Sequence, residues 1–256
     1  MDEHEIENRD HWGGKADAYA AVAPRLWDEA PSWGTWGIPD EACPLLPEDC
    51  TGLDVIELGC GTAYVSGWAA GRGASRVVGV DVTPAQLATA RRMADERGVA
   101  LELVEASAEA VPLPDASFDL AVSEYGASLW CEPDAWLAEA ARLLRPGGRL
   151  AFLTVHPLAT LTAPLDGSIP SGTELLRDWF GDHRYDWRDA VDEPGGIEFV
   201  PTPGAWFRAL DAAGFDVTDY RELRAPADAT GTPAAVTAEW ARRFPSEHAF
   251  WARRRG

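Results

Sequence analysis

Two glycines and two carboxylates are spaced as in a nucleoside-binding crevice. The apolar run 53–58 carries Glu57 and ends in a turn formed by Gly59 and Gly61, and Asp81 closes a second apolar run twenty residues after Gly61. Parallel strands bring such a turn and such a carboxylate together at their carboxyl ends. Glycines let the backbone approach a ligand closely, and Asp81 can accept hydrogen bonds from both ribose hydroxyls. These features alone would also suit NAD.

Two further residues favour a different nucleoside. Tyr64 stands where the dinucleotide fingerprint has its third glycine. Glu57, just before the turn, would repel a pyrophosphate and would favour a ligand that carries cationic ammonium and sulfonium groups. An NAD-dependent oxidoreductase is kept as an alternative function.

Strands and helices alternate around these residues. Thr83 and Pro84 form a typical helix start, with Thr83 as the N-cap. The alternation predicts an α/β fold with a doubly wound, mostly parallel, Rossmann-like sheet. The predicted strands cover residues 53–58, 76–80, 101–104, 118–122, 149–155 and 215–223. The predicted helices cover residues 64–71, 83–98, 133–144 and 203–213.

The rest of the chain is less regular. Residues 1–50 are predicted to form an N-terminal helical cap with two helical segments, 11–23 and 25–30, before breaks at Pro31 and Gly34. Residues 51–256 form the ligand-binding domain. Within it, residues 156–200 are rich in Pro, Gly, Asp and Trp, which indicates an insertion after the fifth strand. The tail, residues 233–256, is predicted to be helical.

Charge and cysteine usage limit the partners. The net charge of −20 argues against nucleic acid and anionic membranes, because it would repel both. The four cysteines show no metal-ligand or disulfide spacing. The first residues are polar, and no apolar run approaches membrane-spanning length. We expect a cytoplasmic protein, a monomer or a homodimer, whose partner is a small molecule.

The chain resembles the class I S-adenosylmethionine-dependent methyltransferases. Four ordered motifs over roughly 100 residues carry the resemblance, which is weaker over the first 50 and the last 100 residues. The matching motifs are Val55-Ile56-Glu57-Leu58-Gly59-Cys60-Gly61-Thr62, Val78-Gly79-Val80-Asp81-Val82-Thr83-Pro84-Ala85-Gln86-Leu87, Ala108-Glu109-Ala110-Val111-Pro112-Leu113-Pro114-Asp115-Ala116-Ser117-Phe118-Asp119 and Ala140-Ala141-Arg142-Leu143-Leu144-Arg145-Pro146-Gly147-Gly148.

The resemblance implies S-adenosyl-L-methionine as the cofactor and S-adenosyl-L-homocysteine as the product. It implies that Gly59 and Gly61 pass under the methionine part, that Glu57 supports the ammonium group and that Asp81 holds the ribose. Other cofactor contacts that it implies are Tyr19 over the carboxylate, Val82 on the adenine, Ser107 and Ala108 at the adenine amino edge, Glu124 near the methionine amine, Tyr125 near the sulfonium, and the motif residues Cys60 and Gln86. Ser107 stands where many relatives carry Asp.

Twelve tryptophans are unusual for this length, and those outside the predicted sheet core could line an apolar cavity. The candidates for binding the methyl acceptor are Trp33, Trp36, Trp130 and Trp179. They favour methylation of a small, apolar or aromatic metabolite, at oxygen rather than at nitrogen or carbon. The low lysine content is typical of actinobacterial chains and agrees with secondary metabolism. A non-catalytic protein that binds S-adenosylmethionine is a second alternative.

A phenol or carboxylate acceptor needs at most one base, and histidine suits this role near neutral pH. His156 directly follows the fifth strand, and His183 lies in the insertion. We therefore predict that one of them deprotonates or orients the acceptor. The acidic residues near the fourth strand, Asp119, Glu124 and Glu132, show no compact ligand pattern, so no metal is expected.

Overall fold

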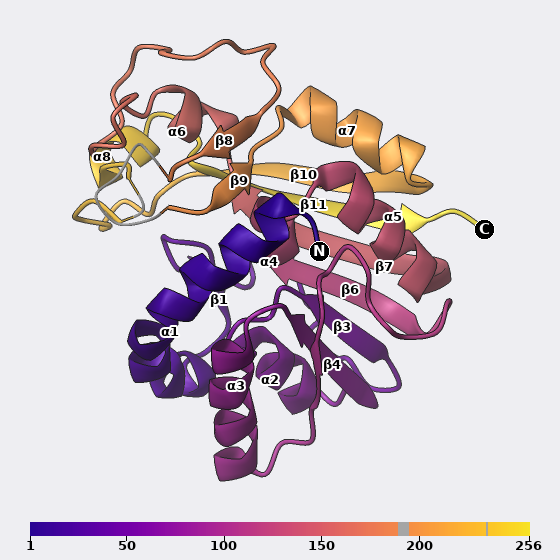
Figure 1. Cartoon of the computed structure of the whole chain (residues 1–256). Helices are drawn as coiled ribbons and strands as arrows, with labels where there is room; N and C mark the ends of the chain where they lie inside the picture. The colour runs from indigo at the N-terminus through magenta and orange to yellow at the C-terminus, as the bar shows by residue number, and fades with distance from the viewer. Residues whose placement is uncertain (189–194, 234) are drawn as a thin grey trace.

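A seven-stranded sheet forms the centre of the molecule (Figure 1). This is a computed structural model, in which residues 1–188, 195–233 and 235–256 are described. The strands are β3 (Asp54–Leu58), β4 (Arg76–Asp81), β5 (Glu102–Glu105), β6 (Phe118–Glu124), β7 (Leu144–Val155), β10 (Phe215–Leu223) and β11 (Glu247–Arg254). Their order is β10-β11-β7-β6-β3-β4-β5, in which β11 runs antiparallel to both neighbours and the other pairs are parallel. The predicted fold class is confirmed.

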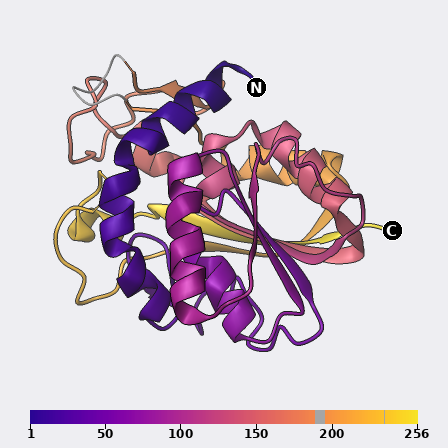
Figure 2. The ribbon, with the colours of Figure 1, turned by 60° about the horizontal axis from the view of Figure 1, so that its bottom comes forward.

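Helices cover both faces of the sheet (Figure 2). They are α1 (Glu3–Asp28), α2 (Tyr64–Gly71), α3 (Pro84–Arg97), α4 (Gly126–Trp130), α5 (Pro133–Leu143), α6 (Pro157–Leu161), α7 (Pro203–Ala212) and α8 (Ala238–Ala241). Successive strand residues alternate between two buried clusters, since Val55 packs with α2 and Ile56 packs with α5 and α7. A third cluster joins α1 to α3. Burial on both faces explains why the inner strands are apolar throughout.

Most predicted boundaries agree with the structure. The helix predicted over residues 64–71 is α2, and α3 begins after Thr83 and ends before Gly98, which has a left-handed φ of 63°. This is the common glycine end of a helix. The main difference is β7, which starts at Leu144 instead of residue 149, because Leu144 still pairs with Phe118 across an irregularity.

The predicted helical tail is wrong. Among the described residues of this tail, only α8 is helical, and β11 inserts between β7 and β10. Ala249 packs into the cluster with α2, whereas Phe250 stacks on Phe152 at 4.9 Å on the opposite face. A segment whose successive side chains are buried on opposite faces must be extended, and this tertiary requirement overrides the helix preference of its alanines and arginines.

The predicted break in the N-terminal helix is also wrong. Residues 3–28 form one helix, with Asp2 and Glu5 in a capping box and Pro24 inside the helix. Arg97 donates a hydrogen bond to the Pro24 carbonyl, and α1 packs along α3. This packing stabilises a helix that local sequence preference would interrupt. None of the described helices is long and apolar enough to cross a membrane.

The segment between β7 and α7 contains α6 and a small hairpin, β8 (Arg184–Asp186) and β9 (Ile197–Phe199). Residues 189–194 of the predicted insertion lie outside the described residues. A second hairpin, β1 (Ser32–Trp33) and β2 (Ile38–Pro39), follows α1. The first turns of α1 lie beside β9 (Figure 1). Consequently the N-terminal helix and the insertion meet over the carboxyl ends of the parallel strands.

Candidate cofactor and acceptor site

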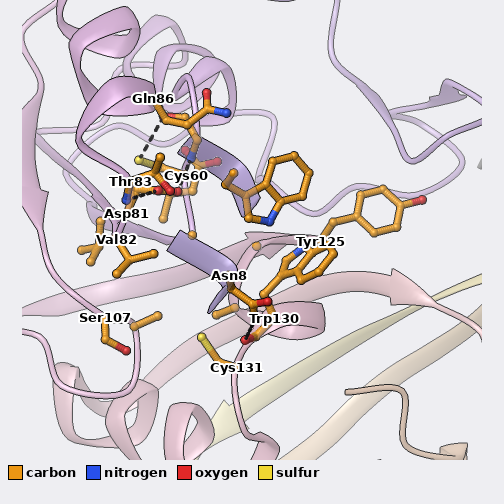
Figure 3. A pocket seen from close by; sticks show the side chains of 18 of the residues that line it. Asn8, Cys60, Asp81, Val82, Thr83, Gln86, Ser107, Tyr125, Trp130 and Cys131 are labelled. Carbon is orange, nitrogen blue, oxygen red and sulfur yellow. Dashed lines mark hydrogen bonds between the residues drawn. The ribbon is translucent and has the colours of Figure 1, made fainter. Parts of the chain in front are cut away.

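A pocket lies at the carboxyl ends of β3, β4 and β6 (Figure 3). In this view Asp81, Val82 and Ser107 lie along one side, and Trp130 and Tyr125 lie across from them. The structure brings all the predicted cofactor residues to this wall: Tyr19, Glu57, Gly59, Cys60, Gly61, Asp81, Val82, Gln86, Ser107, Ala108, Glu124 and Tyr125.

The glycine turn is held against two other elements. The N–H groups of Gly59 and Cys60 both donate to the Val80 carbonyl at 2.9 Å. Gly59 has a φ of 76°, and a Cβ added there would lie 2.5 Å from Gly126 Cα and 2.6 Å from Ala127 N. A side chain at position 59 would therefore meet the backbone at the start of α4. Because Gly59 and Gly61 have no side chains, a ligand can approach the backbone of this turn closely.

Asp81 is fixed by the backbone around it. Its Oδ2 accepts from the Gly61 N–H and its Oδ1 accepts from the Thr83 N–H, both at 2.8 Å. Burial raises the pKa of this carboxyl, although the hydrogen bonds act in the opposite direction. Each oxygen keeps a lone pair, so the oriented carboxylate can accept two hydrogen bonds from a vicinal diol.

Glu57 is 3% exposed, and its Oε2 accepts hydrogen bonds from the N–H of Ser66 at 2.8 Å and from its hydroxyl at 2.5 Å. Burial raises its pKa to about 8, and the negative charges of Glu124 and Asp81 add to this effect. The described pocket wall contains carboxylates but no arginine, lysine or histidine. A cationic nucleoside fits this charge distribution, whereas a pyrophosphate does not.

One face of α1 covers the pocket. Asn8, Trp12 and Tyr19 line it from above, and Trp12 packs edge-on against both Tyr19 and Trp130 with ring centroids 5.2 Å apart. The Asn8 side chain donates to the carbonyls of Trp130 and Ile197 and accepts from the Ile197 N–H. This buried amide ties α1 to α4 and to β9.

Several pocket residues were not among the predicted site residues. They include Asn8, Trp12, Tyr64 and Cys131. Positions 8, 12 and 19 are separated by four and seven residues, so they share one face of a helix. That spacing indicates a shared face, but only the packing of α1 in the fold places this face over the pocket.

Of the four tryptophans predicted to bind the acceptor, Trp130 lines the pocket and the other three do not. Trp33 is fully buried and donates to Asp40, and Trp36 donates to the Ser246 hydroxyl at 2.9 Å. Both belong to the hydrophobic core, where their indole N–H groups are already paired. Trp179 lies in the insertion, partly exposed.

Neither predicted base lines the pocket. His156 is 2% exposed at the start of α6, where its Nδ1 accepts from the Leu158 N–H and its Nε2 lies 3.5 Å from Glu222 Oε1. Burial lowers its pKa to about 4. His183 lines a separate depression beside α5 and α7, and burial lowers its pKa as well. Burial thus favours the neutral form of both histidines, and both lie apart from the cofactor residues.

Over residues 1–188, 195–233 and 235–256, no three His, Cys, Asp or Glu side chains are grouped so that they could hold a metal ion. Asp119 accepts from the Asp54 N–H and pairs with Arg145, while Glu132 caps α5 through the Ala135 N–H. These two carboxylates have structural partners at the two ends of the sheet.

Known proteins show the same architecture. Residues 56–152 match a family described as "Methyltransferase domain". A demethylmenaquinone methyltransferase of Thermus thermophilus is 34% identical over 155 residues, which cover 56% of this chain and 64% of that protein. A ubiquinone biosynthesis O-methyltransferase of a Methylobacterium species is 28% identical over 226 residues, which cover 76% and 89% respectively. This chain thus spans less than two thirds of the Thermus protein.

A crystal structure of an S-adenosylmethionine-dependent methyltransferase from Mesorhizobium loti superposes with a TM-score of 0.64 at 26% identity. The match covers 82% of this chain and 94% of that one. Fold and site together define a protein with a Rossmann-like sheet and an acidic nucleoside pocket. Residues 56–152 thus carry a methyltransferase domain, the chain resembles S-adenosylmethionine-dependent methyltransferases in its fold, and the acidic pocket wall suits S-adenosylmethionine.

Proposed function

We propose that the protein transfers a methyl group from S-adenosylmethionine to a small, apolar or aromatic metabolite, at a hydroxyl oxygen in preference to nitrogen or carbon. One observation carries the proposal: the charged groups on the described pocket wall are carboxylates, and the roof above them is aromatic. Carboxylates favour a cationic donor, and aromatic rings favour an apolar acceptor.

In this proposal, Asp81 receives the ribose hydroxyls on its free lone pairs. Glu57 faces the ammonium group, and Val82, Ser107 and Ala108 surround the adenine. Bound S-adenosylmethionine supplies an electrophilic methyl group, so the protein contributes mainly by positioning the acceptor. Well-oriented reactants can gain about 7–11 kcal/mol in this way.

The acceptor would enter between the α1 roof and the segment after β6. Trp12 and Trp130 form an aromatic wall on one side, and Tyr125 approaches from the other. A relative covered over 89% of its length is named a ubiquinone biosynthesis O-methyltransferase, which supports an oxygen acceptor on an apolar molecule. The net charge of −20 supports a small molecule over nucleic acid.

Calorimetry with S-adenosylmethionine and with NAD tests the donor. We expect micromolar binding of S-adenosylmethionine and no binding of NAD. Asp81→Asn should weaken S-adenosylmethionine at least tenfold, because a charged hydrogen bond is worth about 1.5–3 kcal/mol. Asp95→Asn, at an exposed position on α3, serves as the matched control and should bind normally.

Incubation with labelled S-adenosylmethionine and hydroxylated aromatic molecules tests the transfer. Label in a methyl ether would support the proposal. Donor binding without transfer to any acceptor would instead indicate a non-catalytic protein, and NAD binding without S-adenosylmethionine binding would overturn the assignment of the donor.

A further inference from the structure

A second buried carboxylate lies behind the pocket wall, next to Glu124. Glu124 lines the pocket at the end of β6, and Glu247 is the first residue of β11, where it is 2% exposed. Both side chains meet the turn between β1 and β2. The Gly34 N–H donates to Glu124 Oε1 and the Thr35 N–H donates to Glu247 Oε1, each at 2.6 Å.

The Glu247 carboxylate is incompletely paired. Its Oε2 is buried and has no hydrogen-bond partner, and it lies beside Gly34, where an added Cβ would be 2.9 Å from it. Within the described part of the chain, no arginine or lysine charge lowers the pKa of Glu124 or of Glu247. A buried carboxylate without a counter-charge costs free energy, so a missing partner of positive charge would be bound strongly here.

The surroundings of this pair are aromatic. Tyr64 donates from its hydroxyl to Glu124 Oε2 at 2.5 Å, and the Tyr125 hydroxyl lies 3.1 Å from the Thr35 nitrogen. Both tyrosines line the pocket. Glu124 lines the pocket, whereas Glu247 lies behind it under the Gly34–Thr35 turn, so a ligand from the pocket would reach Glu247 by displacing that turn. Such a ligand would combine an apolar ring with a cation.

We propose that Glu124 and Glu247 form a subsite that holds a protonated amino group of the methyl acceptor, which takes the place of the Gly34 and Thr35 N–H groups. This inference rests on the proposed function and narrows its acceptor to an apolar molecule that also carries a basic amine. The amine binds and orients the molecule, and the methylated hydroxyl lies elsewhere on it.

The charge state of the pair agrees with this role. Burial raises the pKa of Glu247 to about 8, with the charge of Glu124 adding to the effect. Titratable groups near the pair include Tyr64, Tyr125 and the Cys43 thiol, whose own pKa is raised to about 12 by burial. The charges of Arg221 and Asp40 act on the same thiol. With a pKa of about 8, the Glu247 carboxyl is mostly protonated at pH 7 without a ligand, and a bound ammonium would favour its charged form and release its proton to solvent.

Calorimetry on the full chain saturated with S-adenosylhomocysteine tests the subsite. The probes are 2-phenylethylamine and tyramine, with 2-phenylethanol as the neutral match. We expect both amines to bind at least tenfold more tightly than the alcohol. Glu247→Gln should remove this preference. Glu198→Gln should retain it, since Glu198 is a partly buried carboxylate that accepts a hydrogen bond from Trp187 and does not line the pocket.

Hydrogen exchange gives an independent readout. The amines should speed exchange of the amides in residues 32–39 of the wild type, because the turn is displaced, and should leave the Glu247→Gln protein unchanged. If S-adenosylhomocysteine binds but the amines do not, or if Glu247→Gln binds them equally well, the subsite is wrong and the proposed function stands. If S-adenosylhomocysteine itself fails to bind, the proposed function is wrong, and the subsite, which rests on it, is wrong as well.

Discussion

Rossmann-like folds bind both NAD and S-adenosylmethionine, and Glu57 is a residue that distinguishes the two ligands in this chain. Its position before the glycine turn predicts a cationic ligand, and the structure adds that burial raises its pKa to about 8. The carboxyl is therefore mostly protonated at pH 7 without a ligand. A bound ammonium would favour the charged form, so cofactor binding is expected to release protons near neutral pH.

The same residue makes stability depend on pH. The pKa of Glu57 is raised from 4.5 to about 8 on folding, so between these values the folded protein binds more protons than the unfolded chain. The free energy of unfolding should therefore fall as pH rises from 5.5 to 7.5, by at most about 1.4 kcal/mol per pH unit from this group.

Urea titrations of the wild type and of Glu57→Gln at these two pH values would measure the effect. The variant should lose less stability than the wild type between them. The exposed Glu105 supplies a control, since Glu105→Gln should follow the wild-type curve. Equal pH dependence in the wild type and Glu57→Gln would contradict the burial effect.

Site residues were predictable where one motif carries them. Glu57, Gly59 and Asp81 lie at the carboxyl ends of two parallel strands, so their proximity could be inferred from spacing. Asn8 and Trp12 could not be placed in this way, because their contacts depend on how α1 crosses the sheet. Trp33 resembled a cavity residue only because its partner, Asp40, could not be identified without the fold.

Among the elements, the turn after β3 and the start of α4 are in backbone contact at Gly59 and Gly126. Gly59→Ala should destabilise the protein by roughly 2–4 kcal/mol, since about 1 kcal/mol comes from the left-handed backbone and overpacking adds about 1–3 kcal/mol. Cofactor affinity should fall in parallel because the pocket floor must move.

Gly98 gives a matched control for this substitution. It also has a positive φ, 63°, but an added Cβ would meet nothing within 4 Å. Gly98→Ala should therefore cost only about 1 kcal/mol and leave cofactor binding unchanged. Urea unfolding and calorimetry would compare the two variants, and equal losses would show that the contact with Gly126 is unimportant.

Local pattern predicted the elements where burial and propensity agree, as in α2 and α3. It failed for β11, whose alanines and arginines favour a helix while its neighbours in space require a strand. It failed again at Pro24, where contact with Arg97 and α3 keeps α1 continuous. In both cases residues far away in the sequence decide the local conformation.

At the scale of the whole molecule, β11 joins the antiparallel edge of the sheet to its parallel part. Phe250 is fully buried on this strand between Phe152 and Tyr220. Phe250→Ala should destabilise the protein by about 3–5 kcal/mol, as expected for a large cavity in a core. Phe180→Ala is the control, because Phe180 is 94% exposed.

Thermal unfolding should show a clearly lower midpoint for Phe250→Ala and no change for Phe180→Ala. A midpoint close to that of the wild type in Phe250→Ala would mean that β11 contributes little to the core. Cofactor binding should survive at temperatures where the variant is folded, since Phe250 does not line the pocket.

The late position of β11 in the sequence also affects how prone the chain is to aggregate while it is being synthesised. Its partner β7 is translated about ninety residues earlier, and the paired stretch 149–155 is largely apolar. Until residues 247–254 have emerged, one edge of β7 has no strand beside it. Unpaired apolar edges are the usual starting points of aggregation. Chains interrupted before residue 247 should therefore be retained by chaperones or become insoluble, even though every element of the cofactor pocket is already present.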